Sequence, residues 1–202
     1  TIVVILALLE IAVRMFTKPV YPILRTDRGV GTIMKKNVRE YLWHNEPQKE
    51  VLVLTNSLGY VGAYTPQATT TNSRVALLGD STTASIEVDY FRSYSYLLEQ
   101  SINATLAPGE KSVEILNYGI GGTGTFLQYQ RYKRDVAPYH PDYVILMFSD
   151  NDFTDNLNKI NYDPEQYAEG AGRNIHFKEF LLHFQLPKFV FGHLQHNIAF
   201  LR

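Results

Sequence analysis

Three short polar segments, each placed directly after a run of apolar residues, constrain the fold of this 202-residue chain more than any other feature. They are Gly79-Asp80-Ser81, residues 117–122 (Asn-Tyr-Gly-Ile-Gly-Gly) and residues 149–152 (Ser-Asp-Asn-Asp). A short apolar run that stops at such residues is typical of a strand that leads into a functional turn. Strands that alternate with helical patterns predict a parallel sheet with right-handed crossovers. We therefore expect the three turns at one edge of a single sheet, where α/β proteins hold their ligands.

The regular pattern starts after a polar linker at residues 69–73. Strands are predicted for residues 75–78, 113–116 and 143–148, and helices for residues 94–106 and 126–136. The second helix is expected to turn a polar side toward water, made of Gln128, Gln130, Arg131, Lys133 and Arg134. Upstream, the pattern is irregular, with proline and glycine turn signals and one predicted strand at residues 51–54. This upstream part is interpreted as a connecting lobe.

The amino-terminal segment is apolar, and up to residue 16 its only charges are Glu10 and Arg14. It is too short for a complete membrane span but fits the last turns of one. A signal-peptide core and a buried helix of the domain are the alternatives. The expected organisation is the end of a transmembrane anchor helix at residues 1–17, a connecting lobe and linker at 18–72, and an α/β domain at 73–202.

Composition excludes several classes of function. With 19 basic and 20 acidic residues the net charge is −1, and no run of like charges is long enough to bind a polyanion, so nucleic acid is not expected as a partner. The absence of cysteine excludes disulfides, thiolate zinc sites and a thiol nucleophile. His193 and His196 are spaced for a metal, but no third ligand is obvious nearby, so no metal site is predicted.

Each of the three turns supplies one kind of chemical group. Ser81 lies where a helix should begin, so its hydroxyl would be exposed and its N–H would face a bound oxyanion, although a serine there is equally an ordinary helix cap. The glycine turn allows close backbone approach to a ligand, and no Lys-Ser or Lys-Thr follows it as in a phosphate loop. The Asn151 amide can stabilise an oxyanion. The carboxylates around Asn151 leave a divalent-metal site or simple loop capping as alternatives.

Taken together, and in this order, the three turns resemble the sequence blocks of the SGNH hydrolases, also called GDSL esterases and lipases, over residues 74–156. Residues 55–60 (Thr-Asn-Ser-Leu-Gly-Tyr) resemble the segment that precedes the core in membrane-anchored bacterial members. The resemblance implies a flavodoxin-like three-layer α/β/α sandwich with a parallel sheet. It also implies that Ser81 is the nucleophile, that Gly122 and Asn151 donate hydrogen bonds to the oxyanion, and that no metal or other cofactor is needed.

The sequence departs from the family pattern at two places. Ser149 stands where the family usually has glycine. The family's catalytic Asp and His come from a late Asp-x-x-His segment, and none of the six histidines here has Asp three residues before it. Without a base, a serine is a poor nucleophile. We therefore expect the carboxyl-terminal part of the domain to be missing from this chain.

The resemblance implies a serine esterase, acyl hydrolase or acyltransferase that works through a Ser81 acyl-enzyme. Its expected substrates are ester-containing small molecules, lipids or acylated glycans. The domain is expected to be membrane-anchored and extracytoplasmic, although the basic residues after the apolar run, including Arg14 and Lys18, favour the cytoplasm under the positive-inside rule. The alternative is a non-catalytic SGNH-like subunit whose Phe-rich residues 176–202 contact a protein partner in a membrane assembly.

Overall fold

The computed structural model describes residues 2–16, 23–27, 29–44 and 49–157. The Phe-rich segment 176–202 and four of the six histidines (His176, His183, His193 and His196) lie outside these residues.

The amino-terminal apolar segment forms the helix α1 (Ile2–Phe16) of 15 residues, built almost entirely from strong helix formers and β-branched apolar residues. Within the described part of the chain, no helix combines the length and apolar character needed to cross a membrane. Membrane anchoring by residues 1–17 therefore stays a prediction.

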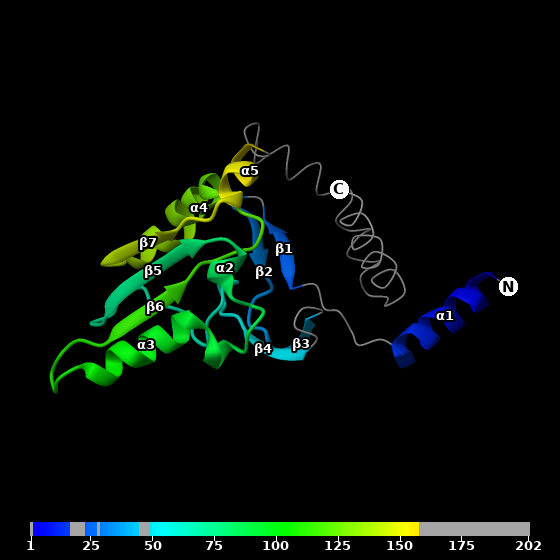
Figure 1. Cartoon of the computed structure of the whole chain (residues 1–202), viewed down its shortest axis with the longest axis horizontal. Helices are drawn as coiled ribbons and strands as arrows, with labels where there is room; N and C mark the ends of the chain where they lie inside the picture. Colours follow the sequence, from blue (N-terminus) through cyan, green and yellow to red (C-terminus); the bar gives the residue numbers. More distant parts are fainter. Residues whose placement is uncertain (1, 17–22, 28, 45–48, 158–202) are drawn as a thin grey trace. The chain divides into compact units, whose positions relative to one another are not determined.

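The central sheet is parallel and contains three described strands, β5 (Ser73–Gly79), β6 (Val113–Asn117) and β7 (Tyr143–Met147). Their order is β6-β5-β7, and Val75 of the central strand pairs with Ile115 on one side and Tyr143 on the other. The helix α3 (Tyr94–Thr105) connects β5 to β6, and α4 (Thr125–Arg131) connects β6 to β7 (Figure 1). This arrangement confirms the expected α/β fold with a parallel sheet.

Every regular element predicted after residue 73 is present within a few residues of its expected bounds. Of the expected solvent-facing side of the second helix, Lys133 and Arg134 are exposed, but the expectation was wrong for Gln128 and Arg131, which are completely buried. The helix also changes type along its length: α4 is followed by a π-helical turn, η2 (Tyr132–Val136), and by a 3₁₀ turn, η3 (Ala137–Tyr139).

The helix α2 (Ser81–Ala84) begins at Ser81, where the sequence predicted a helix start. The sequence pattern missed two further short helices, η1 (Tyr90–Arg92) and α5 (Asn151–Leu157).

The segment before the sheet forms two antiparallel hairpins rather than irregular structure. The first pairs β1 (Leu24–Asp27) with β2 (Gly31–Met34), and the second pairs β3 (Arg39–His44) with β4 (Lys49–Leu54). Only β4 was predicted from the sequence. Asp27 fixes the first turn because its carboxylate accepts hydrogen bonds from the N–H groups of Gly29 and Val30 at 2.9 and 3.1 Å.

The hairpins and the parallel sheet share one apolar core. This core combines residues of the hairpin region, such as Val51 and Tyr60, with residues of the sheet region, such as Ala76 and Tyr118. The buried rings of Tyr60 and Tyr118 meet edge to face, with 4.9 Å between their centroids. The domain boundaries at 18–72 and 73–202 stay a prediction, and the buried cluster includes residues from both segments.

Candidate active site

Ser81 is the first residue of α2, at the carboxyl end of the central strand. The helix is capped by Asp80, whose carboxylate accepts hydrogen bonds from the Thr82 N–H at 2.9 Å and the Thr82 hydroxyl at 2.7 Å. Because Asp80 performs the capping, the Ser81 hydroxyl is not used for it. Ser81 is exposed, and its hydroxyl has no hydrogen-bond partner among the residues that the structure describes.

The second turn packs directly against this helix. A side chain at Gly119 would place its Cβ 2.3 Å from the Ala84 nitrogen, so only glycine fits there. Asn117 reinforces the contact: its amide donates to the Thr83 carbonyl at 2.6 Å, and its side-chain oxygen accepts from the Gly119 N–H at 2.9 Å. The second turn is thus fixed to the first.

The glycine pair in the second turn lies beside Ser81. A Cβ at Gly121 would be 3.4 Å from the Ser81 Cβ, which is ordinary van der Waals contact. Gly122 follows with a φ of +69°, is exposed and has open space around it. Its backbone is therefore accessible to solvent, one residue after the glycine that lies beside Ser81.

The third turn reaches the first through two side chains. The hydroxyls of Ser149 and Thr82 are 3.5 Å apart. Asn151 begins α5, is exposed, and donates from its amide to the Asp155 carboxylate at 3.1 Å. Burial of Asp80 opposes its ionisation, but hydrogen bonds from Thr82, and from the side chains of Asn151 and Ser149, outweigh burial and lower its pKa.

A second buried carboxyl group, that of Asp152, hydrogen-bonds to the backbone of the third turn. It accepts hydrogen bonds from the Ser149 N–H at 3.3 Å and from the Gln128 amide at 3.1 Å. Burial raises the pKa of Asp152, and the nearby charge of Asp80 acts in the same direction. The two buried carboxyl groups are therefore shifted in opposite directions.

The structure thus brings all three predicted site residues to one edge of the sheet, on turns that contact one another around Ser81. Sequence reasoning did not assign a role to Asp80, Asn117 or Asp152. All three residues lie inside the polar segments identified from the sequence, so the sequence did contain a signal for them. Their roles depend on the hydrogen-bond partners that each side chain finds in the folded protein, and the spacing of residues along the sequence does not identify those partners.

Neither described histidine hydrogen-bonds to Ser81. His44 ends β3, and burial lowers its pKa while the charge of Glu87 opposes that shift. His140 follows η3 with a φ of +49°. Among the described residues, no group of three or more His, Asp or Glu side chains is arranged to hold a metal ion.

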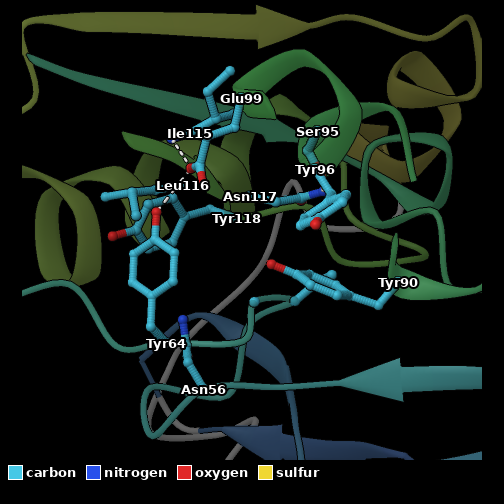
Figure 2. A pocket seen from close by; sticks show the side chains of 12 residues that line it. Asn56, Tyr64, Tyr90, Ser95, Tyr96, Glu99, Ile115, Leu116, Asn117 and Tyr118 are labelled. Carbon is cyan, nitrogen blue, oxygen red and sulfur yellow. Dashed lines mark hydrogen bonds between the residues drawn. The ribbon is translucent and has the colours of Figure 1, made fainter. Parts of the chain in front are cut away.

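A small cavity lies between the hairpin region and the sheet, and Asn117 and Tyr118 at the start of the second turn form part of its wall (Figure 2). Its volume is about 10 Å³, close to what a single water needs. Glu99 lies on its wall and accepts hydrogen bonds from the Tyr64 hydroxyl at 2.8 Å and the Ile115 N–H at 2.7 Å. Neither Ser81 nor Asn151 lines it, so this cavity does not hold the reacting groups.

The sequence model of GDSL-like lipases and acylhydrolases matches residues 75–176, which is half of the chain and contains all three turns. The chain belongs to this family. The Gly79-Asp80-Ser81 turn lies within the matched residues, and the resemblance to this family seen in the sequence is confirmed.

A search of curated proteins found no match. Among solved structures, the chain is similar to AlinE4, an esterase of the SGNH-hydrolase family, with 24% identity and a TM-score of 0.36. The aligned region covers 52% of this chain and 56% of AlinE4.

Proposed function

We propose that this GDSL-family domain hydrolyses or transfers acyl groups through a covalent intermediate on Ser81. The observation that carries the proposal is the meeting of three turns around that residue: a Cβ added at Gly121 would lie 3.4 Å from the Ser81 Cβ, and side chains of the third turn reach Thr82 and Asp80 on either side of Ser81. A free hydroxyl, a glycine amide and a carboxamide are the groups that acyl transfer requires.

The reaction would proceed in two steps. The Ser81 oxygen adds to the carbonyl carbon of an ester while its proton passes to a base, and the resulting oxyanion accepts hydrogen bonds from the N–H groups of Ser81 and Gly122 and from the Asn151 amide. The tetrahedral intermediate then expels the alcohol, which takes the proton from the base. Water or another hydroxyl compound attacks the acyl-enzyme in the same way and releases Ser81.

The base completes the site, because serine is a weak nucleophile without one. We place it outside the described residues, since neither His44 nor His140 bonds to Ser81. Asp80 is not available for the task. Its carboxylate is buried and already accepts two hydrogen bonds from Thr82.

A fluorophosphonate probe tests this proposal in the full-length protein. The probe is expected to label the wild type covalently and to leave Ser81→Ala unlabelled, with Ser85→Ala as a control that removes a nearby hydroxyl and keeps labelling. Wild-type protein that stays unlabelled while folded would contradict the proposal and would favour the non-catalytic subunit as the alternative.

We further propose that the substrate is an ester-containing lipid, acylated glycan or small molecule, and that residues 1–17 anchor an extracytoplasmic domain to a membrane. Membership of an acylhydrolase family supports the ester. The apolar composition of α1 supports the anchor.

A further inference from the structure

Arg131 lies at the end of α4, completely buried beneath the second turn. Its guanidinium donates to the Tyr118 carbonyl at 2.9 Å, to the Thr123 hydroxyl at 3.2 Å and, more weakly, to the Gly79 carbonyl at 3.4 Å. These acceptors are all neutral. Burial of a cation is costly even with the charge of Asp135 nearby, so apolar packing alone does not account for an arginine here.

The three acceptors belong to, or directly follow, the first and second of the three turns that form the site. Gly79 ends β5 immediately before Asp80 and Ser81, and its carbonyl also accepts from the Ile120 N–H at 3.2 Å. Tyr118 lies near the start of the second turn, and Thr123 comes directly after its last residue. A single guanidinium therefore joins the strand that carries the nucleophile to both ends of the glycine turn.

A chain of hydrogen bonds extends this support through the turn. The Thr123 hydroxyl, held by Arg131, donates to the Ile120 carbonyl at 2.6 Å. The Thr123 carbonyl accepts from the Gln128 amide at 2.8 Å. Gly121 and Gly122 are the only residues between Ile120 and Thr123, so α4 fixes the segment on both sides of them.

We propose that Arg131 is a positioning residue that holds the glycine turn in the conformation that directs the Gly122 N–H toward the oxyanion. This inference rests on the function proposed above. Arginine suits the task because its planar fork of donors reaches several acceptors at once, whereas a lysine ammonium on its flexible stem does not reproduce that geometry.

Tyr60 connects the hairpin region to Arg131. The Arg131 guanidinium lies 6.0 Å from the centroid of the Tyr60 ring, and the Tyr60 hydroxyl donates to Asp135, which also binds Arg134 at 2.7 Å. Residue 60 lies outside the 75–176 segment that the family model matches. The support of the glycine turn therefore includes the segment upstream of the matched region.

Arg131→Lys in the full-length protein tests the inference, with Arg74→Lys as a matched control. Arg74 is also buried, at the opposite end of β5, and donates to Glu114 and to the Tyr139 carbonyl, both at 2.7 Å. Both variants are expected to have a lower free energy of unfolding than the wild type. Only Arg131→Lys is expected to lower kcat for ester hydrolysis, by about a hundredfold, because displacement of a catalytic group by an ångström costs about that much. KM should change by less than about threefold, since ground-state binding is retained.

Hydrogen exchange of the peptide that contains residues 117–124 provides a readout that does not depend on activity. Faster exchange is expected in Arg131→Lys than in Arg74→Lys. Equal exchange in the two variants, or equal kcat, would overturn the inference. A wild type without ester hydrolysis would refute the proposed function instead, and the exchange comparison would still decide whether Arg131 holds the turn.

Discussion

Asn151 is the predicted site residue that can be tested with the least disturbance of the fold. It is exposed at the start of α5, and its amide donates to the nearby carboxylate of Asp155 on the same helix. If the amide stabilises the oxyanion, Asn151→Ala should reduce kcat by about a hundred- to a thousandfold while the protein remains folded. Steady-state kinetics with a chromogenic ester measure the effect.

Asn156 provides the matched control on the same helix. Its side chain accepts from the Phe126 N–H at 3.0 Å and donates to the Thr125 hydroxyl at 2.7 Å, so it joins α5 to α4. Asn156→Ala should lower the free energy of unfolding by about 1 kcal/mol and leave kcat nearly unchanged. If both variants lose activity equally, the special role of Asn151 is wrong.

Gly119 is a residue at which a single methyl group should damage the site through packing. Its added Cβ would lie 2.3 Å from the Ala84 nitrogen and 2.6 Å from the Thr83 carbonyl carbon, so backbone must move. Gly119→Ala should cost about 1–3 kcal/mol of unfolding free energy in urea denaturation. Gly62→Ala, where the nearest atoms are 3.5 Å away, is the control and should change stability by less than about 0.5 kcal/mol. Similar losses in both would contradict the close approach.

The short helices α2 and α5 both begin at the edge of the sheet next to a buried carboxyl, and the two carboxyls predict opposite effects of pH. The pKa of the Asp80 carboxyl is lower in the folded protein than in the unfolded chain. Ionised Asp80 therefore stabilises the fold at pH values above its pKa in the unfolded chain, and this stabilisation is lost as pH falls through its pKa in the folded protein. The pKa of the Asp152 carboxyl is higher in the folded protein than in the unfolded chain. Ionisation of Asp152 therefore destabilises the fold as pH rises through its pKa in the folded protein.

Urea denaturation between about pH 3 and pH 7 separates the two effects. Relative to wild type, Asp80→Asn should become less stable as pH rises, because the variant lacks the gain that ionised Asp80 provides. Asp152→Asn should change in the opposite direction, because it lacks the penalty of the buried charge. Parallel pH profiles for the two variants would refute the assigned directions.

The elements that sequence periodicity predicted are those with long or strongly apolar patterns. The three parallel strands and the helices α3 and α4 were recognisable because buried strands and amphipathic helices repeat at fixed intervals. The hairpin strands β1, β2 and β3 were missed because they contain four to six residues each and mix polar with apolar positions. The burial of Gln128 and Arg131 could not be predicted, since both bind backbone acceptors that only the folded turns create.

At the scale of the whole molecule, the order of the three turns along the chain was sufficient to place Ser81, Gly122 and Asn151 at one sheet edge. This worked because parallel strands with right-handed crossovers leave little freedom in where their ends lie. The base could not be predicted, because a late segment with the family spacing does not occur in the sequence. The coupling of Tyr60 to Arg131 also escaped prediction, since it joins residues 71 positions apart.

The proposed membrane anchor concerns the molecule as a whole and can be tested apart from catalysis. Full-length protein should sediment with membranes and be released by detergent but not by high salt, because apolar insertion is insensitive to ionic strength. Deletion of residues 1–17 should move it to the soluble fraction. Release of the intact protein by salt alone, or an unchanged distribution after the deletion, would contradict anchoring by this segment.

A crystal structure of the phosphonylated full-length protein would show directly whether a serine hydroxyl, a glycine N–H and a carboxamide surround one oxygen-sized space. We expect a covalent bond from the Ser81 oxygen to phosphorus. We also expect a phosphonyl oxygen about 3 Å from the nitrogens of Ser81 and Gly122 and from the Asn151 amide. A phosphonyl oxygen that points into solvent, with Gly122 and Asn151 turned away from it, would show that these groups do not form an oxyanion hole.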